Sequence, residues 1–492
     1  MSYLQKYFHS VTEEKRSSAA IAYLAALDHI HSQFPLIADK IGQELKDQRS
    51  YLKLIASENY SSLTVQLAMG NLLTDKYSEG IPHRRFYAGC ENVDEIEEAA
   101  INELKSIFQC DHAYVQPHSG ADANLVAYWA IIVKRIQNKE VEALGKKSVD
   151  ELSAEEYERV RQLMVNQKVL GLSLGSGGHL THGYRHNISS KFMRSSFYDV
   201  DKKTGLIDYS HLREQVLREK PAIIVAGYSA YPRLIDFAKM REIADLVGAT
   251  LLVDMAHFAG LVAGKAIQGE FNPVPFAHVV TSTTHKTMRG PRGGFILCGA
   301  DFREVVDKGC PLVLGGPLPH AIAAKAIAFK EANRPSFRLY AQQIIANARA
   351  LAEHLLSRGV RLATGGTDNH LLLLDVMSSF SLTGRQAELA LRQARFTVNR
   401  NALPFDPQGP WYTSGVRLGT PALTTLGMKE GEMREIAELM FALLRSSRSS
   451  SEGQGAEAGR GKVDVDSPIL LSVQKSVEEL LKRFPLYPEI VI

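Results

Sequence analysis

Four short apolar segments, each ending in small polar residues, constrain the fold of this chain most strongly. They are HAYVQPHSG, AIIVAGYSAY, TLLVDMAHFAG and AHVVTSTTHK. Helical periodicity fills the stretches between them, and strands that alternate with helices favour a mostly parallel sheet covered on both faces. Ligands of such sheets bind just beyond the carboxyl ends of the strands, which is where the polar residues of all four segments fall. The pattern therefore predicts an α/β fold with a binding site at that edge of the sheet.

The rest of the chain suggests three parts. Residues 1–50 have apolar positions at helical spacing and are expected to form a helical arm. Residues 51–320 contain the four strand-like segments and are expected to form a large domain, followed by a smaller α/β domain over residues 321–492. We expect a solvated helical insertion at the charged stretch 134–166, and a flexible loop at the Ser/Gly-rich stretch 446–466.

Composition and charge exclude several classes of protein. The formal net charge is +3 over 492 residues, which gives no support to a nucleic-acid-binding or membrane-surface role. The four cysteines include no C-x-x-C pair, which argues against a disulfide scaffold and a cysteine zinc site. The opening MSYLQKYFHSVTEEKRSS lacks the continuous apolar stretch of a secretory signal, and no apolar run reaches the ~18 residues of a membrane span. We expect a cytoplasmic protein without nucleic-acid or membrane partners.

Asp254 and Lys286 each follow a strand-like segment. A lysine at that edge can be desolvated, which lowers its pKa and makes its amine a nucleophile for Schiff-base formation. An acidic residue on a neighbouring strand can hold a pyridine nitrogen protonated, as the chemistry of pyridoxal phosphate requires. Because α/β proteins also contain surface lysines and helix-capping aspartates, the pair alone leaves both interpretations open.

Three further stretches are ambiguous when taken singly. PHSGADAN places Ser119, Gly120 and Ala121 at a strand–helix turn, where a helix N-terminus can bind phosphate, although such turns are common without a ligand. GSGGHLTHGYRH contains three histidines without a nearby carboxylate or cysteine, which favours a histidine stacked on an aromatic ring over a metal site. KYSEGIPHRRFYAGCENVD gathers tyrosines, basic residues and Glu79, and is either a solvated loop or a source of general acid–base groups.

Taken in order, these motifs resemble the serine hydroxymethyltransferase family, pyridoxal-phosphate enzymes of fold type I. The resemblance runs from about residue 42 to 445 and is most specific in LIASENYSS, VVTSTTHKTMRGPRGG and TSGVRLGTPALTTLG. It implies a mostly parallel seven-stranded sheet in the large domain. It also implies a transferase of one-carbon metabolism that reversibly converts L-serine and tetrahydrofolate to glycine and 5,10-methylenetetrahydrofolate, and so serves glycine and amino-acid biosynthesis.

The resemblance implies roles for individual residues. The catalytic residues would be Lys286, Glu79, His285 and Asp254. Lys286 would carry pyridoxal 5'-phosphate as a Schiff base, Asp254 would pair with its pyridine nitrogen, and His179 would stack on its ring. The remaining cofactor-binding residues, for pyridoxal phosphate or tetrahydrofolate, would be Ser119, Gly120, Ala121, Ser229, His257, Thr283, Gly315, Gly316, Leu174, Gly178 and Leu180. The substrate-binding residues would be Ser57, Tyr77, Glu79, Tyr87, Arg417 and Trp411, and no metal is implied.

The resemblance also implies an assembly and leaves two rival functions. Tyr77, Glu79 and Tyr87 would reach into the site of a partner subunit, so a homodimer with shared active sites is expected. Ala121 stands where the family usually has a serine, which removes one side-chain bond to phosphate, and Phe86 replaces a common tyrosine. The rivals are a folate-independent threonine aldolase or amino acid racemase of the same fold, and a non-catalytic scaffold.

Overall fold

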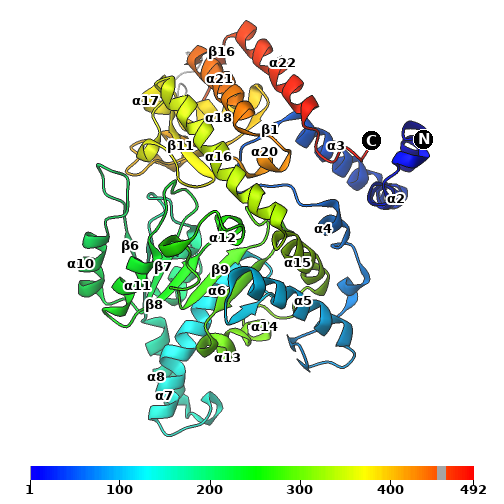
Figure 1. Cartoon of the computed structure of the whole chain (residues 1–492). Helices are drawn as coiled ribbons and strands as arrows, with labels where there is room; N and C mark the ends of the chain where they lie inside the picture. Colours follow the sequence, from blue (N-terminus) through cyan, green and yellow to red (C-terminus); the bar gives the residue numbers. More distant parts are fainter. Residues whose placement is uncertain (1, 451–460) are drawn as a thin grey trace.

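The computed structural model describes residues 2–450 and 461–492, and its centre is a seven-stranded sheet (Figure 1). In spatial order the strands are β4 (His112–Tyr114), β10 (Gly294–Cys298), β9 (Val279–Thr283), β8 (Thr250–Asp254), β7 (Ile223–Gly227), β5 (Lys168–Leu172) and β6 (Arg194–Tyr198). All neighbouring pairs are parallel except those of β10, which runs antiparallel to both β4 and β9. The predicted α/β fold with a mostly parallel seven-stranded sheet is confirmed.

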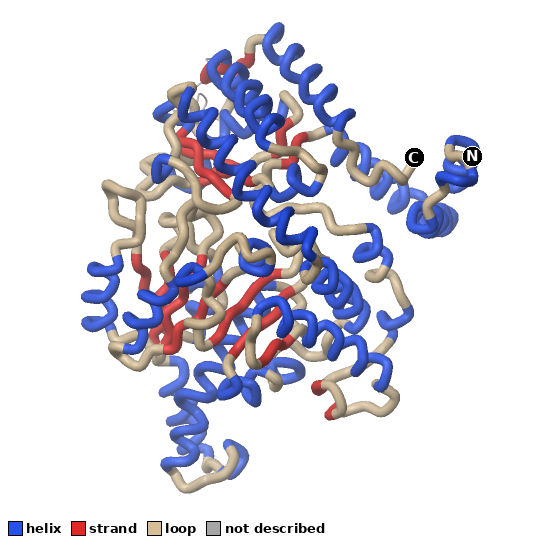
Figure 2. Tube along the Cα trace, in the orientation of Figure 1, coloured by secondary structure: helices blue, strands red, loops and turns tan. Residues whose placement is uncertain are grey.

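Hydrophobic cores cover both faces of this sheet, with helices outside the strands (Figure 2). In β7, Ile224 and Ala226 belong to the first core and Ile223 and Val225 to the second, as the two-residue period of a strand requires. The first core is covered by α5 (Glu91–Phe108), α10 (Tyr209–Glu219), α11 (Phe237–Asp245), α12 (Ala259–Ala263) and α15 (Pro319–Ala332). The second is covered by α6 (Gly120–Ile132), α9 (Ser189–Phe192) and α13 (Arg303–Val306).

A separate hydrophobic core surrounds a smaller antiparallel sheet. This sheet has the order β11 (Leu371–Asp375), β14 (Gly415–Gly419), β13 (Asn399–Asn401). Its helices are α16 (Pro335–Ser357), α17 (Val376–Phe380), α18 (Gly384–Gln393), α20 (Pro421–Thr425), α21 (Glu430–Ser446) and α22 (Ser467–Arg483). Helix α16 gives Phe337 to the large core and Leu355 to the small one, whereas α15 packs wholly with the large domain. We therefore propose a domain boundary within α16 rather than at residue 320.

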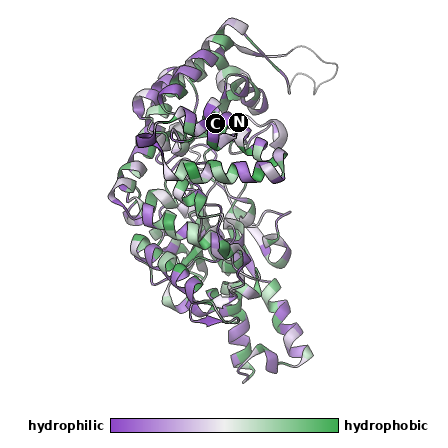
Figure 3. Cartoon of the chain, turned by 90° about the vertical axis from the view of Figure 1, so that its right-hand side faces the viewer, coloured by the Kyte–Doolittle hydropathy of each residue, from purple (hydrophilic) through white to green (hydrophobic). Residues whose placement is uncertain are grey.

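The N-terminal arm packs against the C-terminal end of the chain. It consists of α1 (Tyr3–Ser10), α2 (Ser18–Gln33) and α3 (Pro35–Ser50). Arg49 of α3 donates hydrogen bonds to the carbonyl oxygens of Leu486, Tyr487 and Ile490. The arm faces the viewer in Figure 3, where hydrophobic residues alternate with hydrophilic ones along its helices. Within the part of the chain that the structure describes, no helix is both long and apolar enough to span a membrane.

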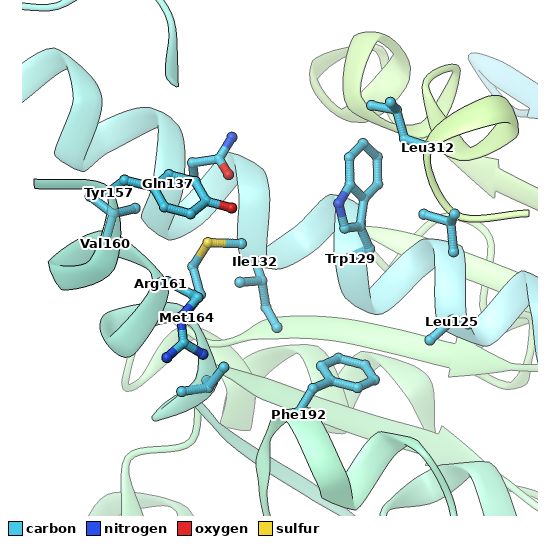
Figure 4. Close-up of a pocket in the computed structure, with 12 residues that line it drawn as sticks. Leu125, Trp129, Ile132, Gln137, Tyr157, Val160, Arg161, Met164, Phe192 and Leu312 are labelled. Carbon is cyan, nitrogen blue, oxygen red and sulfur yellow. The ribbon is translucent and has the colours of Figure 1, made fainter. Parts of the chain in front are cut away.

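The insertion at residues 134–166 contains two α-helices and projects away from the sheet (Figure 1). They are α7 (Asn138–Ala143) and α8 (Ala154–Val165). A pocket of about 460 Å³ separates α8 from α6, with Trp129 and Ile132 on one side and Val160 and Met164 on the other (Figure 4). This pocket lies apart from the polar residues that end the strands.

Short elements complete the chain. They are β1 (Leu52–Lys53), α4 (Leu63–Leu67), β2 (Gly80–Ile81), β3 (Arg84–Arg85), α14 (Gly309–Leu312), β12 (Phe396–Thr397), α19 (Gly409–Tyr412), β15 (Ser447–Ser449) and β16 (Val463–Val465). Residues 451–460 of the loop expected at 446–466 lie outside the described residues. The described flanks of that stretch contain β15 and β16, which pair antiparallel rather than forming an irregular loop.

Candidate active site

Asp254 and Lys286 lie at the same edge of the large sheet. Asp254 is the last residue of β8, and Lys286 follows the end of β9 by three residues. Strands β8 and β9 are parallel neighbours, so their carboxyl ends open at one edge. The two sequence-predicted residues are therefore brought together by the topology of the sheet.

Asp254 is a buried, ionised carboxylate. Its Oδ2 accepts hydrogen bonds from Asn124 Nδ2 at 2.8 Å and His182 Nε2 at 3.1 Å, and its Oδ1 accepts one from the backbone N–H of Ala256 at 3.0 Å. Burial alone would raise the pKa of Asp254, but the hydrogen bonds and the charge of His182 outweigh it and hold the pKa far below its usual range. The carboxylate can therefore accept a proton-bearing nitrogen at pH 7.

Lys286 carries an amine whose pKa is lowered. Burial lowers the pKa of Lys286 to about 8, against the opposing effect of Asp254 and with further lowering by Arg417 and Arg292. Its Nζ donates to Thr283 Oγ1 at 3.3 Å, and Thr283 in turn donates to the carbonyl oxygen of Ala256 at 3.2 Å. A larger share of neutral, nucleophilic amine is thus present near pH 7 than in a solvated lysine.

His179 lies beside this pair with a neutral ring. Burial lowers the pKa of His179 to about 4, and its Nδ1 lies 2.7 Å from Thr181 Oγ1. One atom each from His179, His182 and Asp254 lies within 4.8 Å of the others, a spacing that a metal ion could use, but His186 lies outside this group. The hydrogen bonds to Thr181 and Asp254 already engage the two imidazoles.

The N-terminus of α6 forms a candidate anion site. Ser119 caps the helix, since its Oγ accepts from the backbone N–H of Asp122 at 3.1 Å. Within the described residues, the backbone N–H groups of Gly120 and Ala121 donate to no other residue, as is usual for the first turn of a helix. A Cβ at Gly120 would lie only 2.5 Å from Thr283 Cγ2, so only glycine allows this turn to approach the end of β9.

Arg417 reaches the site from β14 of the small domain. Its Nη1 donates to the carbonyl oxygen of Ser229 at 2.6 Å and its Nε to Asn399 Oδ1 at 3.2 Å. Desolvation lowers the pKa of Arg417 to about 10, and among the described residues no carboxylate forms an ion pair with it. Ser57 lies near the same strand, because a Cβ at Gly419 would meet the Cα of the residue before Ser57 at 2.4 Å.

Three histidines, His257, His370 and His285, lie close enough to Lys286 for its charge to lower their pKa values. His257 Nδ1 lies 3.1 Å from His370 Nε2, and the two rings are stacked with centroids 5.4 Å apart. Burial, with Lys286 and Arg417 nearby, lowers the pKa of His257 far below its usual range, so the ring is neutral. His285 has its Nδ1 buried without a hydrogen-bond partner, and burial lowers its pKa to about 3.

Tyr77, Glu79 and Tyr87 form a second group, the tyrosine–glutamate group, on the surface. The rings of Tyr77 and Tyr87 meet edge to face with centroids 5.1 Å apart, and Tyr87 Oη donates to Glu79 Oε2 at 3.3 Å. Gly316, which follows Gly315, lies beside them, since a Cβ there would be 3.7 Å from the Tyr77 ring. Within the described chain, no hydrogen bond or ion pair joins this group to Lys286, Asp254 or Arg417.

The residues expected on the folate side lie on exposed segments. Leu174 and Leu180 are exposed, and Gly178 between them admits no side chain, because a Cβ would lie 2.0 Å from the carbonyl oxygen of Leu172. Trp411 is also exposed, with two guanidinium groups 4.8 and 5.0 Å from its ring centroid.

Sequence reasoning missed four residues of the buried site. Asn124 and His182 bind Asp254, Asn399 binds Arg417, and His370 binds His257. Asn124 lies in PHSGADAN and His182 in GSGGHLTHGYRH, two stretches already singled out, whereas Asn399 and His370 lie outside them. Which partner each one binds depends on contacts between distant segments and has no local signal.

Comparisons with known proteins show the family to which this chain belongs. A family model described as serine hydroxymethyltransferase matches residues 30–142 and 153–440. The chain is 57% identical over 489 residues to the serine hydroxymethyltransferase of Treponema pallidum (strain Nichols), covering 99% of this chain and 85% of the relative. It is 52% identical to that of Salinispora tropica, covering 96% and 99%, and 51% identical to that of Chlamydia trachomatis serovar D, covering 99% and 98%. The chain belongs to the serine hydroxymethyltransferase family.

Proposed function

We propose that this chain catalyses the reversible conversion of L-serine and tetrahydrofolate to glycine and 5,10-methylenetetrahydrofolate. The family depends on pyridoxal phosphate and uses tetrahydrofolate as cosubstrate, which makes the chain a transferase of one-carbon metabolism. The observation that carries the proposal is the pairing of Lys286, whose pKa is lowered, with the ionised Asp254 at one edge of the sheet. A scaffold that had lost its chemistry would not need to keep this pair of opposite charges enclosed.

The residues at this edge fit pyridoxal 5'-phosphate by their chemistry. An aldehyde needs an amine whose neutral fraction is raised near pH 7, a phosphate needs free backbone N–H groups, and a pyridinium nitrogen needs an ionised carboxylate. Lys286, the first turn of α6 and Asp254 meet these needs in that order. When bound, pyridoxal phosphate withdraws electrons from the bond that breaks at Cα of the amino acid.

The protein groups hold the ligands and their protons. Asp254, fixed by its three hydrogen bonds, keeps the proton on the pyridine nitrogen, and the neutral His179 covers the ring. Thr283 and His285 line the amine of Lys286. Ser229 and His257 donate near the phenolic oxygen. Ser119, Gly120 and Ala121 bind the phosphate; Ala121, without a hydroxyl, contributes only its backbone.

The substrates are held by groups from different segments. Arg417 binds the carboxylate of serine, and Ser57 and Tyr77 complete that site. Glu79, hydrogen-bonded to Tyr87, moves the proton of the serine hydroxyl. Leu174, Gly178, Leu180 and Trp411 form the tetrahydrofolate side, where exposed apolar side chains can pack on a flat pterin ring.

The decisive experiment is a serine-to-glycine assay on the purified full chain loaded with pyridoxal phosphate, with and without tetrahydrofolate. Glycine should form rapidly only when the folate is present. Equal rates of serine cleavage without folate, or a clear preference for threonine, would favour the aldolase or racemase alternative. Absence of turnover under both conditions, with the cofactor bound, would favour the scaffold.

The exposed tyrosine–glutamate group supports a homodimer. We propose that a second copy of the chain covers this surface. Several large apolar side chains are exposed near this group and on the N-terminal arm: Leu72, Phe86, Leu312, Phe34 and Leu36. Burial of such side chains against a second copy would stabilise association. In the dimer, Tyr77, Glu79 and Tyr87 face the partner's Lys286, and Gly315 and Gly316 approach the partner's phosphate. A cytoplasmic location is proposed because all four cysteines are free, as a reducing compartment keeps them.

Mixing two inactive variants tests the shared site. Lys286→Ala and Tyr77→Ala chains are combined under conditions that allow subunits to exchange. A mixed dimer then has one site with both lesions and one intact site, so part of the activity should return. No recovery after demonstrated exchange, or full activity in an isolated monomer, would refute the shared site.

A further inference from the structure

Lys325, in the middle of α15, is a fully buried lysine with no role in the site described above. Its side chain is 1% exposed, although lysines are almost never fully buried without a partner. Nζ donates three hydrogen bonds, to the carbonyl oxygens of Val115 at 2.7 Å, Pro117 at 2.8 Å and Gly294 at 3.0 Å. An ammonium group has three N–H donors, so all of them are used.

The three acceptors lie where two strands separate. Strands β4 and β10 pair antiparallel up to Tyr114 and Ile296, and the chain then leaves β4 toward the first turn of α6. Pro117 lies two residues before Ser119, and its carbonyl oxygen also accepts from the backbone N–H of Gly294 at 3.0 Å. Lys325 therefore joins the start of β10 to the segment that leads into the anion site.

Glycines make room for this contact. A Cβ at Gly293 would lie 2.4 Å from Lys325 Cε, and a Cβ at Gly294 would lie 2.3 Å from the carbonyl oxygen of Ser119. The missing side chain at Gly293 therefore lets Lys325 reach its backbone acceptors. The missing side chain at Gly294 lets β10 approach Ser119, the cap of α6. The fit leaves little freedom for the segment 115–119.

The charge of Lys325 is stabilised mainly by these carbonyl oxygens. The carboxylate that acts most strongly on Lys325 is that of the buried Glu97, whose oxygens accept from Gln116 Nε2 and Arg85 Nη2, each at 2.8 Å, and not from Lys325. Burial lowers the pKa of Lys325 to about 7, with Glu97 opposing the shift. Two of the hydrogen bonds hold the segment 115–117 and the third holds the start of β10, so together they fix that segment against the sheet.

We propose that Lys325 is a positioning residue whose three hydrogen bonds fix the backbone before Ser119 and so direct the free N–H groups of Gly120 and Ala121 at the phosphate of the cofactor. The inference rests on the proposed function. The proposal can be tested with two ligands that differ only in the phosphate. The affinity for pyridoxal 5'-phosphate should depend on the first turn of α6, whereas the affinity for pyridoxal should not.

The test compares the binding of these two ligands to full-length chains freed of cofactor, by absorbance titration. In Lys325→Met, the Kd for pyridoxal 5'-phosphate should rise at least tenfold while that for pyridoxal stays within twofold. A role in stability alone would weaken both equally, and that result, or an unchanged ratio, would overturn the proposal. Lys330→Met is the matched control, since Lys330 lies on the same helix, is exposed and pairs with Glu103 at 2.8 Å.

A second variant covers the case in which Lys325→Met does not fold. Gly293→Ala keeps the lysine but displaces it, and it should lower the preference for the phosphorylated ligand in the same way. The wild-type chain distinguishes failure of the proposed function from failure of the role proposed for Lys325. A wild-type chain with no preference for pyridoxal 5'-phosphate over pyridoxal refutes both ideas, whereas wild-type preference retained in these variants refutes only the role of Lys325.

Discussion

Replacement of Arg417 by lysine should weaken serine binding without affecting cofactor loading. The guanidinium has five N–H donors, of which one binds Asn399 Oδ1 and one binds the carbonyl oxygen of Ser229. The two terminal nitrogens therefore keep three N–H groups for a ligand. Because no described carboxylate pairs with Arg417, the carboxylate of serine is its expected counter-ion.

The magnitude follows from the hydrogen bonds that are lost. A lysine keeps the positive charge but replaces a two-pronged contact with a single point contact. One hydrogen bond to a charged group is worth about 1.5–3 kcal/mol. The dissociation constant for serine should therefore rise by roughly 10- to 150-fold, since about 1.4 kcal/mol corresponds to a factor of ten.

The assay is a titration of the loaded enzyme with serine, followed through the absorbance of the bound cofactor. Cofactor affinity should stay within about twofold, because Arg417 contacts neither Asp254 nor the first turn of α6. Arg358→Lys is the control, since Arg358 is an exposed arginine that pairs with Glu438 on the small domain. Serine affinity that is unchanged in Arg417→Lys would remove Arg417 from the carboxylate site.

Three further predictions concern the lysine and its carboxylate. Lys286→Ala should abolish covalent attachment of the cofactor, measured as the mass retained after borohydride reduction; retained mass would refute the assignment. Since burial lowers the pKa of Lys286 to about 8, the neutral amine increases with pH, and cofactor attachment to the apo chain should accelerate about tenfold between pH 7 and 9. A flat rate profile would contradict this. Asp254→Asn should lower serine turnover about 100-fold, and turnover near wild type would argue against its role.

Local sequence patterns predicted part of the sheet. The apolar runs of β4, β7, β8 and β9 were recognisable because buried strands are short, continuous and rich in branched residues. Strand β6, with the sequence RSSFY, lies at an edge and is mostly half-exposed, so it lacks that pattern. The insertion of β10 between β4 and β9 depends on pairing over long range, which no local pattern encodes.

The same distinction applies to the site. Asp254 and Lys286 were predictable because parallel strands bring their carboxyl ends to one edge. The contact of Arg417 with Ser229 joins two domains and could not be derived from spacing. Lys325 did have a signal: it lies four residues from both Ala321 and Phe329, on the buried face of α15, where a charged residue is unexpected.

The bond between Arg417 and Ser229 couples substrate binding to the contact between domains. Ser229 follows β7 of the large sheet, and Arg417 belongs to β14 of the small one. One N–H of the guanidinium therefore contributes to the contact between the two domains, while its remaining donors are free to bind the ligand. A change at Arg417 can alter either contact, so the melting temperature of Arg417→Lys should be measured together with its affinity for serine. A large loss of affinity with an unchanged melting temperature identifies the carboxylate contact as the part that was lost.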